Sequence, residues 1–126
     1  MDIPAKLGIP AYEFRAVIGG TTIDYDLNKE EINRKKHGYS LESAVHMLER
    51  LLLPSPKPRP HFVSDAFEEK GEVRHMHLTM DDSDNVVLMV TTMRPNETVR
   101  VISFRRANDK EIKEFERLAR NVLAMR

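Results

Sequence analysis

Three strand-like runs follow one another in the second half of the chain, with only short polar turns between them. They cover Glu72–Met80, Val86–Met93 and Thr98–Arg105, and the turns are Asp81–Asn85 and Arg94–Glu97. Such short connections join neighbouring antiparallel strands, so the sequence predicts a three-stranded meander. Its middle run is the most continuously apolar, which is typical of a central strand that is covered on both faces.

Three helices are predicted around this meander. The first covers Leu27–Lys36, and Gly38 is placed to end it in a left-handed cap. Ser40 can N-cap a second helix, and Asn108 with Glu111 has the capping-box spacing that opens a third. The apolar stripe of the second helix, which should pack on the sheet, consists of Leu41, Ala44, Val45, Leu48, Leu51 and Leu52. The stripe of the third consists of Ile112, Phe115, Ala119, Val122 and Leu123.

Two further segments have a clear local character. Tyr12–Ile18 and Thr21–Tyr25 are β-prone runs separated by Gly19-Gly20, a pair that tolerates the positive φ angles of a hairpin turn. The alternating prolines of Pro54–Pro60 cannot continue a helix and predict an extended surface loop. We expect an α+β fold with a single domain over residues 1–126.

The composition limits the classes of function. The 126 residues carry 20 basic and 20 acidic side chains, which disfavours a polycation such as a histone-like protein. The absence of cysteine excludes a disulfide framework, a thiolate zinc site and a cysteine nucleophile, and is compatible with a reducing compartment. The longest aliphatic run, Val86–Val90, is far too short to span a bilayer. We therefore expect a soluble cytoplasmic protein.

The first predicted helix carries polar residues along one stripe. Lys29, Asn33, Lys36 and His37 recur at the spacing that places them near one side of a helix. Such a stripe is either a hydrated surface or a surface that faces phosphate or an acidic partner. Lysine would neutralise phosphate charge, and His37 has the side chain that titrates near neutral pH.

Histidines and arginines on the meander are further candidates. His75 and His77 share a face of their strand, as two metal ligands would, but no nearby carboxylate completes a recognisable ligand set. Half-exposed strand histidines are the favoured interpretation. Arg74 points to the opposite face and either reaches the edge or is held for a functional contact. Of Arg105 and Arg106, one is expected to pair with an acid while the other meets solvent or ligand.

Motifs for other chemistries are missing from the sequence. It contains no Gly-rich phosphate loop, nucleophile elbow or HExxH, so nucleotide hydrolysis, esterase and zinc peptidase activities lack support. The acidic loop Asp81–Asn85 begins like a calcium loop, but Val86 replaces the required glycine and Thr92 the final glutamate. No metal or other cofactor is expected.

Three segments together resemble the BrnT family of small ribonuclease toxins, the partners of BrnA antitoxins in bacterial type II toxin-antitoxin pairs. The family's opening W-D-x-x-K-x-x-x-N-x-x-K-H-G-x-S is similar to Tyr25-Asp26-x-x-Lys29-x-x-x-Asn33-x-x-Lys36-His37-Gly38-x-Ser40. Its T-E-R hairpin resembles Thr92-Met93-Arg94, its I-S-A-R-R-A strand end resembles Ile102-Ser103-Phe104-Arg105-Arg106-Ala107, and Arg74 matches an arginine that begins a strand.

The resemblance covers about residues 25–116, and residues 1–24 and the Pro-rich loop have no counterpart in the family. Tyr25 replaces the usual tryptophan, Met93 replaces an acid and His75 replaces an apolar residue. The resemblance implies a RelE-like fold, in which two helices precede a small antiparallel sheet and one follows it. It also implies metal-independent RNA cleavage and neutralisation by a small BrnA-like antitoxin.

Cleavage by a ribose 2′-hydroxyl needs a base, an acid and cationic stabilisation of the phosphorane. The resemblance leads us to expect phosphate contacts from Arg74, Arg94, and Arg105 or Arg106, and RNA contacts from Lys29 and Asn33. For proton transfer the candidates are Lys36 or His37, with His75 or His77 behind them. The alternative is a non-catalytic BrnT-like module that binds protein or nucleic acid, which the neutral charge and Met93 favour.

Overall fold

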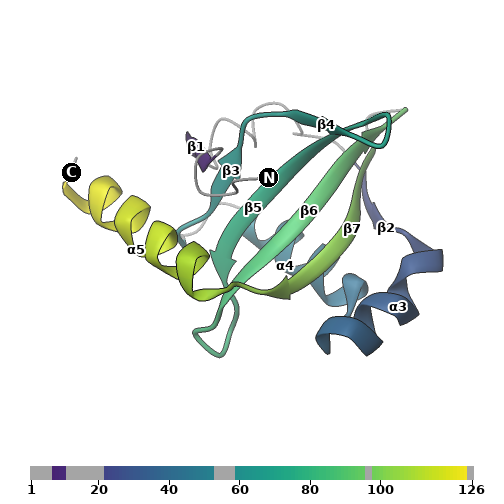
Figure 1. The fold of residues 1–126 in the computed structure, drawn as a ribbon, viewed down its shortest axis with the longest axis horizontal. Coiled ribbons are helices and arrows are strands. Elements are labelled where there is room, and N and C mark those ends of the chain that lie inside the picture. Colours follow the sequence, from purple (N-terminus) through teal and green to yellow (C-terminus); the bar gives the residue numbers. More distant parts are fainter. Residues whose placement is uncertain (1–6, 11–21, 53–58, 96–97, 125–126) are drawn as a thin grey trace.

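The computed structural model describes residues 7–10, 22–52, 59–95 and 98–124 (Figure 1). In these residues the helices are α3 (Leu27–His37), α4 (Leu41–Leu52) and α5 (Asp109–Ala124). The strands are β1 (Leu7–Pro10), β2 (Thr22–Tyr25), β3 (Phe62–Ser64), β4 (Phe67–Glu69), β5 (Glu72–Met80), β6 (Val86–Arg94) and β7 (Thr98–Arg106). The fold is α+β, as predicted.

The predicted meander is confirmed, with bounds that differ by no more than one residue. Strands β5, β6 and β7 pair antiparallel in chain order, and β6 lies between the other two. The whole sheet has the order β1-β3-β5-β6-β7-β2, with β4 paired to β5. Strands β1, β3 and β4 are three or four residues long, too short to show a periodic pattern, so they are not predicted from the sequence.

The expectation of an antiparallel sheet is wrong at one edge. Thr22–Tyr25 forms the strand predicted there, but β2 pairs in parallel with β7, so the sheet is mixed. The long connection between β2 and β7 includes α3 and α4, which makes a parallel pairing possible. The predicted partner Tyr12–Ile18 lies outside the described residues, as does most of the Pro-rich loop.

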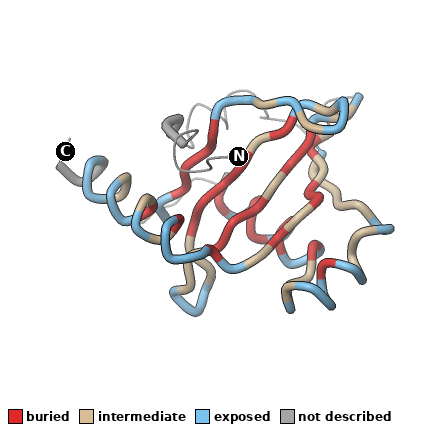
Figure 2. The backbone as a smooth tube through the Cα atoms, in the orientation of Figure 1, coloured by how far each residue is buried: buried red, intermediate tan, exposed pale blue. Residues whose placement is uncertain are grey.

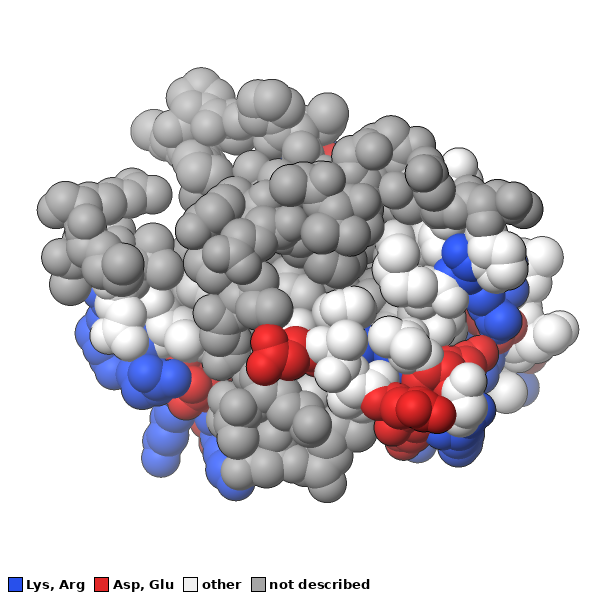
Figure 3. Space-filling model, turned by 90° about the horizontal axis from the view of Figure 1, so that it is seen from above, with Lys and Arg blue, Asp and Glu red and all other residues white. Residues whose placement is uncertain are grey.

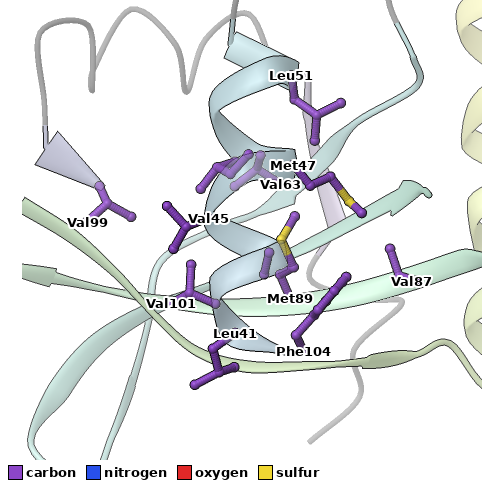
Figure 4. Packing of buried hydrophobic residues seen from close by; sticks show 12 residues of the cluster. Leu41, Val45, Met47, Leu51, Val63, Val87, Met89, Val99, Val101 and Phe104 are labelled. Carbon is purple, nitrogen blue, oxygen red and sulfur yellow. The ribbon is translucent and has the colours of Figure 1, made fainter. Parts of the chain in front are cut away.

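The sheet separates two hydrophobic clusters. Helix α4 packs Leu41 and Leu48 of its apolar stripe against one face, which we call the α4 face, and this face includes Val87, Met89 and Val101 (Figure 4). Helix α5 packs Phe115 against the opposite face, the α5 face, which includes Met76 and Leu88. Figure 2 shows the buried stretches running through the middle of the three long strands and along α4, while α3 is mostly exposed.

Local capping fixes the position of the helices. Gly38 ends α3 with φ +74°, as predicted, and its N–H donates to the Arg34 carbonyl at 2.8 Å. The carboxylate of Glu30, which no sequence motif indicates, accepts from the N–H groups of Leu41 at 2.8 Å and Glu42 at 3.1 Å and so caps α4. These bonds fix the corner between the two helices, where His37 lies.

Candidate functional site

Residues from five strands form one row on the α5 face. The pairing registers place Phe67 opposite Arg74, Arg74 opposite Thr92, and Thr92 opposite Arg100. Asp24 of the parallel strand β2 completes the row beside Arg100. Because paired residues share a face of the sheet, the row brings Arg74 and Arg100 together from strands far apart in sequence.

A carboxylate links two arginines at the end of the sheet. Glu72 Oε2 lies 3.1 Å from Nη2 of Arg74, and Glu72 Oε1 lies 3.3 Å from Nη2 of Arg94. Glu69 Oε2 lies 3.4 Å from the Nη1 atom of Arg74. Figure 3 shows acidic and basic side chains gathered side by side towards the right of the view, at this end of the molecule. We call Arg74, Arg94 and Arg100 the arginine cluster.

The arginine cluster contains two nitrogen donors that no described residue accepts from. The side chain of Arg74 is 10% exposed, and the Nε atoms of Arg74 and Arg94 are buried with no hydrogen-bond partner in the part of the chain that the structure describes. Arg100 makes a bidentate pair with Asp24, at 3.0 Å from Nε and 3.2 Å from Nη2. The bonds to Asp24 raise the pKa of Arg100. The cluster is therefore a charged site with spare hydrogen-bond donors.

Arg100 is absent from the sequence-based candidates. Simple alternation along one strand would place Arg100 and Arg105 on opposite faces. The β6–β7 register shifts between Val90 and Thr91, so Ile102 has no partner and both arginines lie on the α5 face. No pattern in the sequence predicts this bulge, so the place of Arg100 in the site is known only from the structure.

The two arginines at the end of β7 have different roles, as predicted from their alternation. Arg105 binds both oxygens of Glu111, at 2.8 and 2.9 Å. The side chain of Glu111 is buried, with 2% of it exposed. Arg106 is exposed and, like its partner Val87, belongs to the α4 face. Asn108 and Glu111 exchange the predicted capping-box bonds at 2.9 and 2.8 Å, so Arg105 joins β7 to the start of α5.

His37 lies near Arg105 and away from the arginine cluster. Partial burial, followed by the charges of Lys36 and Arg105, lowers the pKa of His37, so its ring is neutral near pH 7. Lys36 is exposed. Arg105 pairs with Leu88 and Arg100 with Thr92, four residues further along β6, which separates the two positions by about 13 Å.

The polar stripe of α3 is only partly open to solvent. Asn33 is buried, and its amide is bonded to the backbone of Tyr39 and Phe104. Lys29, one turn earlier, is half-buried, and Lys36 is exposed. The middle of the stripe therefore faces β7, and only its ends are accessible to a ligand.

The strand histidines lie on the α4 face, away from the arginine cluster. His75 is half-buried, as predicted, but the prediction of half exposure is wrong for His77, which is fully buried because β3 pairs with β5 beside it. His77 Nδ1 lies 2.9 Å from His61 Nε2, and His77 Nε2 lies 2.9 Å from Thr91 Oγ1. Burial, then the neighbouring His61 and His75, lowers the pKa of His77 well below 6.5. Within the described ranges no three potential ligands lie close enough to hold a metal ion.

Comparison with protein families identifies the chain. The model of the family described as "Ribonuclease toxin, BrnT, of type II toxin-antitoxin system" matches residues 25–111, from the end of β2 to the first turn of α5. The chain belongs to the BrnT family. The match includes His37 and all three members of the arginine cluster.

Membership of the BrnT family gives the broad function. BrnT proteins are ribonuclease toxins of type II toxin-antitoxin systems, so RNA is the target and an antitoxin is the partner. The comparison with curated proteins gives no significant match. In the described part of this BrnT-family chain, no helix is long and apolar enough to cross a membrane.

Proposed function

We propose that this protein cleaves RNA without a metal ion, with the arginine cluster holding phosphate. The observation that carries the proposal is the convergence of three guanidinium groups, from β5, β6 and β7, on one face of the sheet. Guanidinium is the group best suited to bind phosphate oxygens in pairs. The Nε donors of Arg74 and Arg94 have no acceptor among the described residues, and this supports the assignment, because a phosphate oxygen could satisfy them.

The proposed reaction uses the ribose itself as nucleophile. The 2′-oxygen forms a bond to the adjacent phosphorus, the bond from phosphorus to the 5′-oxygen breaks, and the proton of the 2′-hydroxyl passes to a base. The 5′-oxygen takes up a proton, which leaves a 2′,3′-cyclic phosphate and a 5′-hydroxyl end. DNA lacks the 2′-hydroxyl and cannot react in this way.

His37 is the proposed proton-transfer residue. Its lowered pKa keeps the ring in the neutral form that accepts a proton near pH 7. Lys36 is the alternative, and Lys29 would contact the RNA backbone. Since His37 and the arginine cluster are separated along β7, an RNA strand would reach them through successive nucleotides. Asn33 and Arg105 would position the site, because their polar groups are bonded within the protein.

The remaining parts of the proposal follow from the family. We infer a RelE-like fold, a cytoplasmic location where cellular RNA is available, and a BrnA-like antitoxin that covers the basic site. The alternative of a non-catalytic module has one observation in its favour, because carboxylates of Glu69, Glu72 and Asp24 already neutralise the arginine cluster. A cleavage assay separates the two functions.

The test measures cleavage of a single-stranded RNA by the purified protein in excess chelator. Cleavage should persist, and Arg94→Ala should lower kcat/KM by about tenfold, because it removes a contact to a phosphate that neighbours the cleaved one. Arg106→Ala is the matched control, because Arg106 is exposed on the opposite face and its loss should change the rate less than twofold. Activity that vanishes with chelator and returns with zinc or magnesium contradicts the mechanism. RNA binding by a folded protein without any cleavage supports the non-catalytic module.

A further inference from the structure

We propose that the carboxylate of Glu72 occupies the position that an RNA phosphate takes between Arg74 and Arg94, so that RNA binds by displacing it. The proposal rests on the proposed function, in that RNA is the ligand. It assigns to Glu72 the role of an internal competitor at the phosphate position.

The geometry around Glu72 is that of a bound oxyanion. Each of its two oxygens lies near a different guanidinium, at 3.1 Å from Arg74 and 3.3 Å from Arg94. Two non-bridging oxygens of a phosphodiester would be held in the same way, by one nitrogen from each arginine. The charge of Glu72 also contributes to the raised pKa of Arg100, whose direct partner is Asp24.

The buried position of Arg74 explains why a carboxylate is needed when RNA is absent. A guanidinium that is nine-tenths buried is costly without a counter-ion. Glu72 and Glu69 supply that counter-ion, but their oxygens leave the Nε atoms of Arg74 and Arg94 without an acceptor in the described residues. A phosphate group carries more acceptor oxygens than a carboxylate, so the exchange can satisfy donors that Glu72 leaves open.

The location of Glu72 allows it to leave. It is the first residue of β5, directly after the tight turn at Lys70 and Gly71, where φ is +52° and +75°. Its side chain is 28% exposed. Because the side chain already reaches the surface, the carboxylate can turn towards water.

The experiment measures binding of a 2′-O-methyl RNA oligonucleotide, which cannot be cleaved by the proposed reaction. In low salt, Glu72→Gln should bind this probe about three- to tenfold more tightly than the parent protein, because the glutamine no longer competes as an anion. The difference should shrink as salt is raised, since screening weakens both competitors. Equal or weaker binding by Glu72→Gln, with a melting curve that shows a folded protein, overturns the proposal.

Glu68→Gln is the matched control. Glu68 lies on the same hairpin and its loss changes the net charge equally, but it pairs with Val73 and so belongs to the opposite face. Glu68→Gln should change the affinity less than twofold. If Glu68→Gln tightened binding as much as Glu72→Gln, the gain would come from the change in overall charge, and the proposal would be wrong. In an Arg94→Ala background, the gain from Glu72→Gln should be largely lost.

Two further outcomes keep the inference separate from the proposed function. If Glu72→Gln does not fold, Glu72→Asp provides the test, because the shorter side chain cannot bridge both arginines and should also bind the probe more tightly. Tight binding without cleavage of ordinary RNA would contradict the proposed catalysis and still support the role of Glu72. Absence of probe binding by both the parent and the variant would overturn the inference even if RNA were cleaved.

Discussion

The side-chain amide of Asn33 pairs with the backbone of Phe104 as a neighbouring strand would. Its Nδ2 atom donates to the Phe104 carbonyl at 2.8 Å, and its Oδ1 atom accepts from the Phe104 N–H at 3.2 Å. Strand β2 pairs with β7 only as far as Val101, so α3 completes this edge through one side chain. A second bond from Nδ2, to the Tyr39 carbonyl at 2.8 Å, fixes the segment between α3 and α4.

Replacing Asn33 by alanine should destabilise the fold by about 2–4 kcal/mol, because it leaves buried backbone groups of Phe104 without partners. Urea unfolding measures the change. Asn28→Ala is the matched control, since this exposed asparagine is on the same helix and should lose no more than about 0.5 kcal/mol. Equal losses in the two variants would show that Asn33 has no special structural role.

Arg105→Ala should lower the free energy of unfolding by about 2–4 kcal/mol, because it leaves the buried carboxylate of Glu111 unpaired. The neighbouring Arg106→Ala, which removes an exposed arginine, should cost about 0.5 kcal/mol or less. Thermal or urea unfolding of both variants gives the comparison. If Arg105→Ala were as stable as Arg106→Ala, the ion pair with Glu111 would not join β7 to α5 in solution.

Stability should fall as the pH is lowered from 7.5 to 5.5. The pKa of His77 is lowered well below 6.5 in the folded state, so the unfolded chain takes up a proton first and unfolding is favoured below about pH 6.5. The lowered pKa values of His37 and His75 act in the same direction. Each such group contributes at most about 1.4 kcal/mol per pH unit.

Urea unfolding at several pH values checks this dependence. In His77→Gln the slope of stability against pH should be smaller than in the parent, although the variant is less stable at pH 7.5. His46→Gln, which removes an exposed histidine, should keep the parent slope. The pKa values of Glu30 and Glu111 are lowered from their ordinary 4.5, so the stability that these carboxylates contribute is lost only as the pH falls below about 4.5. They therefore do not affect the slope between pH 7.5 and 5.5. A parent slope retained in His77→Gln would refute the assignment.

The rate of RNA cleavage should rise with pH and level off by about pH 7. The pKa of His37 is lowered below 6.5, so by pH 7 its ring is in the neutral form that accepts a proton. His37→Ala should lower the rate by about 100-fold and remove this rise. Lys36→Ala tests the alternative, and it should keep the shape of the profile. If Lys36→Ala instead abolished cleavage while His37→Ala kept the parent profile, Lys36 would be the proton-transfer residue.

Local patterns were sufficient for the elements that depend on neighbours in the sequence. The meander, the stripe of α4, the cap at Gly38 and the capping box at Asn108 all match the structure, because each depends on residues a few positions apart. Strand β2 was recognised as a strand, but its parallel pairing with β7 was not, because a partner far along the chain leaves no local pattern. The burial of His77 is not predicted from the sequence for the same reason, since β3 covers it from outside its own hairpin.

The sequence by itself determined which residue types can bind phosphate and transfer protons, and family membership follows from their spacing. Only the tertiary structure decided which of them meet. The unpaired Ile102 reverses the alternation in β7 and brings Arg100 onto the face of Arg74 and Arg94. Cross-strand register then separates the arginine cluster from Arg105, because register depends on how distant segments align and not on the order of residues within any one of them.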